Sequence, residues 1–266
     1  MNKASISAAI LLAAFLNSTL AAADTIPLCG YLCFHSTDST RVDVTMTHEL
    51  QPDRQVHLSL PRSAIVFVSG YDPLAIEKLP DRIATDGKWL TFAIVISDGR
   101  PIGEAVADYS QQNAVSLDSA ATELRPDYAL IDISIIGRDV PDERLYSAYL
   151  LRGMDWTDLK SAEPFDGLPA KILSFQSKNS AGTMQSATGH RTNYFPASAG
   201  DPFLMIQCDN EPNPVYWCDY FVRPNDVVKL TIQMPDFRAY GGRQFIRDRL
   251  NMVLRAYCDY DVGCNP

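Results

Sequence analysis

Six cysteines fall in three close pairs, and this spacing constrains the fold more than any other feature of the sequence. The pairs are Cys29 with Cys33, Cys208 with Cys218, and Cys258 with Cys264. Closely paired cysteines in an even number favour disulfides when the chain folds in an oxidising compartment, although the sequence alone does not give the connectivity. The interpretation of the cysteines therefore depends on where the protein folds.

The N-terminal residues 1–23 predict export. Lys3 supplies a positive charge, residues 5–16 form an apolar stretch, and residues 21–23 are three alanines that precede Asp24. This order is typical of a secretory signal peptide with a small-residue cleavage site. We expect cleavage before Asp24 and a mature protein in the periplasm. No later run approaches the ~20 apolar residues of a membrane helix, so no membrane span is expected.

Export makes disulfides the favoured interpretation of all three cysteine pairs. Zinc binding is the alternative. The gaps, however, are C-x3-C, C-x9-C and C-x5-C, and structural zinc sites commonly use a C-x2-C pair. His35 adds one possible ligand near Cys33 but no pattern. The sequence therefore predicts disulfides, with no metal and no other cofactor.

Short apolar, β-branched runs bounded by turn residues predict a chain rich in strands. In the run over 227–234, polar residues at 229, 231 and 233 alternate with apolar residues at 230, 232 and 234. A broken helix is expected over 102–124, a weak helix over 144–151, an amphipathic helix over 242–257, and a polar loop or irregular hairpin over 177–198. Strands are expected over 55–60, 64–68, 89–96, 128–136, 170–176, 203–208, 217–222 and 227–234.

This pattern predicts an α+β fold of mainly antiparallel strands with packed helices, stapled by disulfides. Each half of the chain has a group of strands followed by a helical stretch. We therefore expect two loosely similar lobes, an N-terminal lobe over 24–146 and a C-terminal lobe over 147–266.

The charge balance argues against two classes of partner. The chain has 23 basic and 32 acidic residues, a formal net charge of −9. An acidic surface repels phosphate backbones and anionic lipid. Nucleic acid and membrane surfaces are therefore not expected partners.

No motif predicts a catalytic residue. His48 and Glu49 begin a metalloprotease-like fragment, but Pro52 stands where the second histidine is needed. The sequence also contains no nucleophile elbow and no phosphate-binding glycine loop. The carboxylates considered as possible acid–base pairs show no spacing that brings two together; they are Asp98, Asp132, Asp155, Asp158, Asp209, Glu211 and Asp219.

The loop between Cys208 and Cys218 is the strongest candidate for a contact surface. It combines acidic residues, two prolines and two aromatic residues. A cross-linked, proline-bearing loop loses little entropy on binding, and Tyr and Trp are favoured contact residues. An inward-packed pair of aromatics beside the disulfide is an equally weighted alternative. The predicted contact residues are Asp209, Glu211, Tyr216 and Trp217.

Three segments carry a resemblance to a known class of proteins: VHLSLPRSAIVFV, WLTFAIVISDGRPI and the C-terminal block from FLMIQC to LRAYC. The chain resembles periplasmic proteins of Gram-negative bacteria, some of which are immunity proteins encoded beside type VI secretion toxins. The resemblance implies a non-enzymatic protein that binds and sterically neutralises a cognate antibacterial toxin. The alternatives are an exported hydrolase with a non-signature active site and an envelope ligand-binding module.

Overall fold

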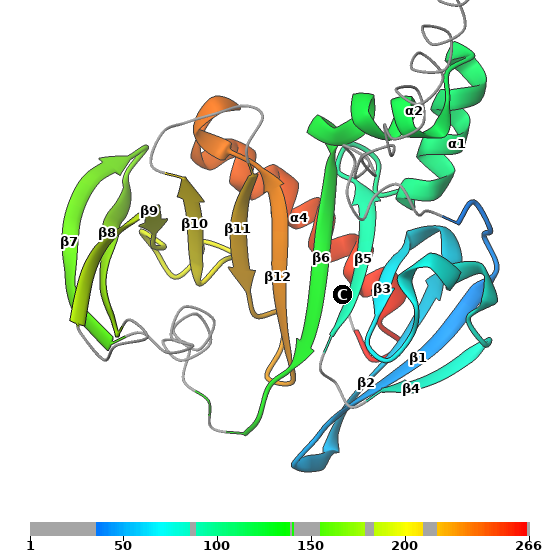
Figure 1. Cartoon of the computed structure of the whole chain (residues 1–266), viewed down its shortest axis with the longest axis horizontal. Helices are drawn as coiled ribbons and strands as arrows, with labels where there is room; N and C mark the ends of the chain where they lie inside the picture. Colours follow the sequence, from blue (N-terminus) through cyan, green and yellow to red (C-terminus); the bar gives the residue numbers. More distant parts are fainter. Residues whose placement is uncertain are drawn as a thin grey trace, which may run out of the picture.

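The computed structural model describes residues 36–85, 89–138, 140, 155–178, 184–209 and 217–264, and Figure 1 shows how they are arranged. The strands form a three-stranded sheet of order β2-β1-β4 and a nine-stranded sheet of order β3-β5-β6-β12-β11-β10-β9-β8-β7. The small sheet consists of β1 (Arg41–His48), β2 (Gln51–Pro61) and β4 (Arg82–Thr85). The large sheet consists of β3 (Ile65–Val68), β5 (Leu90–Val95), β6 (Tyr128–Ile135), β7 (Asp155–Phe165), β8 (Leu168–Lys178), β9 (Met184–Tyr194), β10 (Met205–Asp209), β11 (Trp217–Val222) and β12 (Val228–Pro235). The α-helices are α1 (Ile102–Asn113), α2 (Leu117–Leu124) and α4 (Arg243–Tyr260).

All neighbouring strands of the large sheet pair antiparallel. In the small sheet β1 pairs antiparallel with β2 and parallel with β4. The predicted α+β class, with mainly antiparallel strands and packed helices, is confirmed.

The large sheet joins the two halves of the chain. β6 precedes residue 146 and β12 follows it, yet the two strands pair along their length, with Ile131 opposite Ile232. The expected boundary at 146/147 lies outside the described residues. The β6–β12 pairing therefore places strands of both expected lobes in one continuous sheet.

One face of the large sheet is covered by α4, which runs behind the sheet in Figure 1. Ile246, Leu250, Val253 and Tyr257 recur at helical spacing, so they share one face of α4, and all four are buried. They belong to one apolar cluster with residues of the large sheet and of β1 and β2. Burying one such side chain contributes about 1.5–3 kcal/mol, so this cluster holds the two sheets and α4 together.

The opposite face of the large sheet is partly covered by α1 and α2. Successive strand residues point to opposite faces, so Phe92 and Ile94 join the α4 cluster while Ala93 and Val95 pack with α1 and α2. Gly103 lets α1 pack closely against the backbone of Ser36 and Ser63, because an added Cβ would overlap the Ser36 carbonyl oxygen.

Most predicted elements are confirmed, including the break between α1 and α2 and the amphipathic helix α4. Residues 177–198 lie largely in the β8–β9 hairpin, so the hairpin alternative holds. Strands β1, β4 and β7 were not predicted. The expected helix at 144–151 and the signal peptide lie outside the described residues. In the part of the chain that is described, no helix is long and apolar enough to span a membrane.

Candidate functional site

The predicted disulfides are confirmed for two of the three cysteine pairs. Cys208 on β10 is joined to Cys218 on β11, and Cys258 in α4 is joined to Cys264. Cys29 and Cys33 lie outside the described residues. The first disulfide ties β10 to β11 close to the end of β10 and the start of β11.

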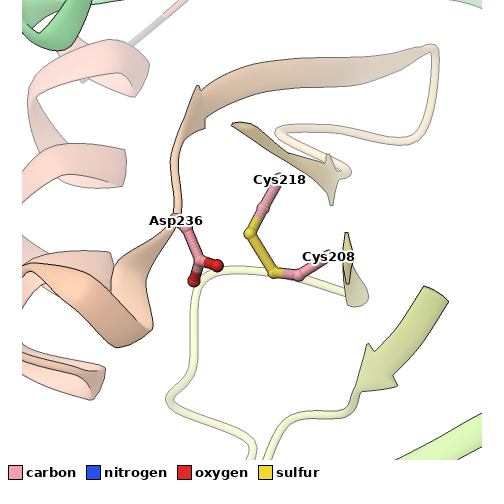
Figure 2. Close-up of side chains that lie close together, drawn as sticks. All are labelled: Cys208, Cys218 and Asp236. Atoms are coloured by element: carbon pink, nitrogen blue, oxygen red, sulfur yellow. A yellow bond between two sulfur atoms is a disulfide. The ribbon is translucent and has the colours of Figure 1, made fainter. Parts of the chain in front are cut away.

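One cluster has the residue types of a metal site but not the chemistry. Cys208, Cys218 and Asp236 lie together and are buried, and Figure 2 shows the two sulfur atoms bonded to each other beside the carboxylate. The thiolate is the form of cysteine that binds metals. Because both sulfurs are used in the disulfide, this cluster offers a metal no thiolate.

The carboxylate of Asp236 is held by Arg238 instead. The guanidinium Nε and Nη2 atoms of Arg238 donate to Asp236 at 2.6–3.1 Å, and both side chains are 2% exposed. Arg238 also donates to the Tyr194 hydroxyl at 3.2 Å and to the Asp209 carbonyl at 2.5 Å. This buried ion pair therefore anchors the end of β10 next to the disulfide.

The predicted contact residues that can be located lie on one face of the sheet. Asp209 ends β10 and Trp217 begins β11, while Glu211 and Tyr216 lie outside the described residues. The Asp209 side chain is 43% exposed and lies 3.5 Å from Arg191. The Trp217 ring packs edge-on against Tyr128, with ring centroids 4.9 Å apart, and Arg125 lies over it. Trp217 is half-buried. Part of its ring packs inward against Tyr128, and part remains accessible to a partner.

A row of polar side chains crosses the same face, and we call it the polar ladder. It consists of cross-strand neighbours on β12, β11, β10, β9 and β8, namely Gln233, Asp219, Gln207, Asn193 and Lys171. The Gln207 amide donates to the Asn193 side-chain oxygen at 3.0 Å, and Asn193 donates to the Lys171 carbonyl at 3.3 Å. Buried polar groups are costly unless they are hydrogen-bonded, and the ladder meets this requirement.

Arg191 on β9 links the ladder to Asp209. Its Nη1 atom donates to Asp219 at 2.9 Å and to Gln207 at 3.1 Å. Burial raises the pKa of Asp219, and the nearby charge and hydrogen bond of Arg191 oppose that rise. Arg191 is half exposed, so one cation connects the buried ladder to the surface.

A cavity of about 260 Å³ opens beside the ladder, between β3, β5, β6 and β12. The side chains that line it are mostly apolar or aromatic, with three polar groups; they are Val66, Phe67, Trp89, Thr91, Leu130, Asp132 and Gln233. Thr91 Oγ1 donates to Asp132 at 2.5 Å. Apolar walls with a few placed polar groups are typical of small-ligand sites.

The charge in this cavity is a partly buried carboxylate. Burial raises the pKa of Asp132, and the charge of Asp219 adds to the rise, while the Thr91 hydrogen bond and the Lys229 charge oppose it. Burial lowers the pKa of Lys229, and Asp132 opposes that change. The structure therefore brings Asp132 and Asp219, two of the carboxylates considered from the sequence, to one face.

Several residues of this face were not singled out from the sequence. Arg191 lies in a stretch that reads as a polar loop, and nothing there marks it. A signal did exist for Asp132, because it is a charged residue within the apolar strand YALIDISI. Its neighbour across the sheet, Thr231, belongs to the predicted alternation over 227–234, whose apolar members are buried.

Comparison with known proteins identifies no family. No protein-family model matches the chain, and no curated protein matches it. A solved structure of the Neisseria meningitidis iron-regulated outer membrane lipoprotein FrpD is similar, with 10% identity, a TM-score of 0.35, and coverage of 85% of this chain and 97% of that one. The di-domain ARO/CYC BexL from the BE-7585A biosynthetic pathway is similar with 13% identity and a TM-score of 0.18, over 67% of this chain and 72% of that one. Likenesses at these scores assign neither fold family nor function.

Proposed function

We propose that the chain is an exported binding protein that neutralises a secreted antibacterial toxin. The single observation that carries the proposal is that the Cys208–Cys218 disulfide joins the end of β10 to the start of β11. There Asp209 and Trp217 lie on one face, at the two ends of a cross-linked loop. The resemblance to immunity proteins supplies the class of partner.

Rigidity is the main physical support for a binding role at this place. The disulfide fixes the bases of the loop, and the buried Asp236–Arg238 pair holds the Asp209 carbonyl. A contact surface that is already ordered loses less conformational entropy when a partner binds. The toxin would be inhibited sterically, with this end of the sheet covering its active-site cleft.

Charge is the second support. The chain carries a net charge of −9, and Asp209 presents a half-exposed carboxylate at the loop. Complementary charge raises the rate of association more than the final affinity. We therefore expect the toxin to present a basic surface around its cleft, and its capture to slow down at high salt.

The test is a capture experiment with the oxidised, exported protein as bait and an extract that contains the product of the neighbouring gene. One stoichiometric, toxin-like partner is the expected result. The loop is tested with the variants Glu211→Ala and Tyr216→Ala, with Leu50→Ala, which alters an 83% exposed side chain on the β1–β2 turn, as the control. Capture of no partner would contradict the function, and capture unaffected by both loop variants would contradict the site.

The cavity beside Asp132 favours a second candidate function, an envelope ligand-binding module. It has a size, an apolar lining and a charged group suited to a small ligand. The discriminating observation is thermal stabilisation by a small molecule in the absence of a protein partner.

A further inference from the structure

The cavity between β3, β5, β6 and β12 has a floor and a wall of different chemistry. Asp132 of β6 and Thr91 of β5 are opposite each other in the sheet and contribute the polar floor. Trp89 and Phe67 contribute aromatic surface, and Trp89 is 55% exposed. A carboxylate and two aromatic side chains therefore line one cavity that is partly open to solvent.

The carboxylate at the floor is incompletely compensated. In the part of the chain that is described, the side chain that donates to Asp132 is that of Thr91, whereas a carboxylate can accept about four hydrogen bonds. Lys229 supplies positive charge near Asp132. On β12, Thr231 lies opposite Asp132, with Gln233 two residues after it in the cavity lining and Lys229 two residues before it, away from the cavity. A buried carboxylate stays costly until a cation or further donors reach it.

The aromatic wall favours the same kind of ligand as the floor. The face of an aromatic ring carries negative electrostatic potential, and Trp attracts cations more strongly than Tyr or Phe. An anion would be repelled by the Asp132 carboxylate, whereas a cation that lies over the ring of Trp89 or Phe67 is attracted. A neutral apolar ligand would leave the carboxylate uncompensated.

We propose that this cavity binds an organic cation, a primary ammonium or guanidinium group on a short apolar stem, with the charge at Asp132 and the stem against Trp89, Phe67 and Leu130. The volume of about 260 Å³ is slightly below the range of about 300–1,000 Å³ for drug-sized ligands. It suits a small amine or a single basic side chain. These are two sources of one chemistry, and the inference holds whether or not the protein neutralises a toxin.

The proposal predicts how binding depends on pH. The charged groups near Asp132 are Lys229 on β12 and Asp219 on β11, and Asp219 is held by Arg191. Because burial raises the pKa of Asp132, a cation that binds its carboxylate competes with a proton as the pH falls. The affinity for a cation is therefore expected to decrease as the pH is lowered towards the ordinary range of a carboxyl group, while the affinity for a neutral ligand stays constant.

The first experiment is calorimetric titration of the full, oxidised protein with three probes of the same shape: phenethylammonium, 2-phenylethanol and phenylacetate. We expect phenethylammonium to bind at least about tenfold more tightly than the other two. Asp132→Asn keeps the side-chain shape and the Thr91 hydrogen bond, and it should abolish most of that preference. Trp89→Ala removes an exposed aromatic side chain from the cavity lining. It should lower the affinity for phenethylammonium by a similar factor.

Matched controls separate the site from general effects of charge and surface. Asp53→Asn removes a carboxylate that is 57% exposed on β2, and Leu50→Ala removes an exposed apolar side chain. Neither should change the affinity for phenethylammonium. If phenylacetate or 2-phenylethanol binds as tightly as the amine, or if Asp132→Asn leaves the preference intact in a folded protein, the proposal is wrong.

A second set of probes distinguishes the two sources. N-acetyl-lysine amide and N-acetyl-arginine amide present the side chains of a protein partner. Binding as tight as that of phenethylammonium supports a basic side chain as the occupant, and binding of the free amine alone supports a small molecule. Failure of every cation to bind would overturn the inference without affecting the capture experiment, which uses the loop of β10 and β11.

Discussion

The buried Asp236–Arg238 pair should dominate the stability of the disulfide end of the large sheet. Both side chains are 2% exposed, and Arg238 donates to Asp236 through two of its nitrogen atoms. The substitution Asp236→Asn removes the negative charge and keeps an oxygen that can accept the bond from the Arg238 backbone amide. The variant therefore removes the charge of the Asp236 carboxylate from beside a buried guanidinium.

The expected loss is large compared with the total stability. Removing one partner of a buried ion pair costs about 3–5 kcal/mol, and domains unfold with about 5–15 kcal/mol. Arg238 also bonds the Tyr194 hydroxyl and the Asp209 carbonyl, and these bonds keep it from turning out to solvent. We expect Asp236→Asn to lower the free energy of unfolding by about 3–5 kcal/mol.

Equilibrium unfolding in urea, followed by far-ultraviolet circular dichroism, measures this loss. The control is Asp53→Asn, because Asp53 pairs with Arg138 on the surface and both side chains are more than half exposed; it should change the free energy by about 1 kcal/mol or less. The double variant Asp236→Leu with Arg238→Met removes both charges and should lose less than Asp236→Asn alone. A loss below about 1 kcal/mol for Asp236→Asn would refute the reasoning, since a pair that costs so little to break is not a desolvated one.

Three further predictions concern pH, the disulfide and close packing. Because the pKa of Asp132 is raised in the folded state, its contribution to stability is present at low pH and is lost as the pH rises through that pKa. Asp132→Asn should therefore raise the melting temperature at pH about 7, with the difference shrinking towards pH about 4; a difference that grows on acidification would contradict the sign. Replacing Cys208 and Cys218 by serine removes a cross-link between residues 10 positions apart. It should lower the free energy of unfolding in urea by about 3 kcal/mol. An unchanged unfolding midpoint would contradict this stabilising role of the disulfide. Gly103→Ala places a methyl group against the Ser36 carbonyl and should cost about 1–3 kcal/mol. Gly200→Ala adds a Cβ whose nearest neighbour, the Ser198 hydroxyl, is 4.0 Å away, and it should leave the melting temperature unchanged.

The elements that the sequence predicted are those whose burial pattern is strong. In β12, Leu230, Ile232 and Met234 belong to the α4 cluster. Thr231 and Gln233 lie on the opposite face of the sheet, which carries the polar ladder. Period-2 alternation of this kind predicts a strand with one buried face. The face of α4 was predictable for the same reason, at helical spacing.

The missed strands have weaker or misleading patterns. β7 reads DWTDLKSAEPF, with charges and a proline that are typical of turns, and its place at the edge of the large sheet tolerates them. In β1 the alternation of Val42, Val44 and Met46 was present, and all three are buried, so this strand was predictable. The order of the large sheet was not, because the β6–β12 pairing joins segments about 100 residues apart and no local pattern encodes such a contact.

The two faces of the large sheet differ in a way that packing alone does not require. On the α4 side the strand residues described as buried are mostly apolar, and apolar residues would fill the other side at lower cost than a buried charged network. Instead the polar ladder spans β12 to β8, with Asp132 and its cavity beside the β12 end and Asp209 and Arg191 beside the middle, on β10 and β9. Buried charge next to both a cavity and a cross-linked loop is consistent with the binding role that we propose for this face. Trp217, at the start of β11, packs against the same apolar cluster as Leu130, which lines the cavity. Substitutions at Asp132 and at the loop that affect their own ligands independently would show two separate sites, and coupling between them would show that both bind parts of one partner.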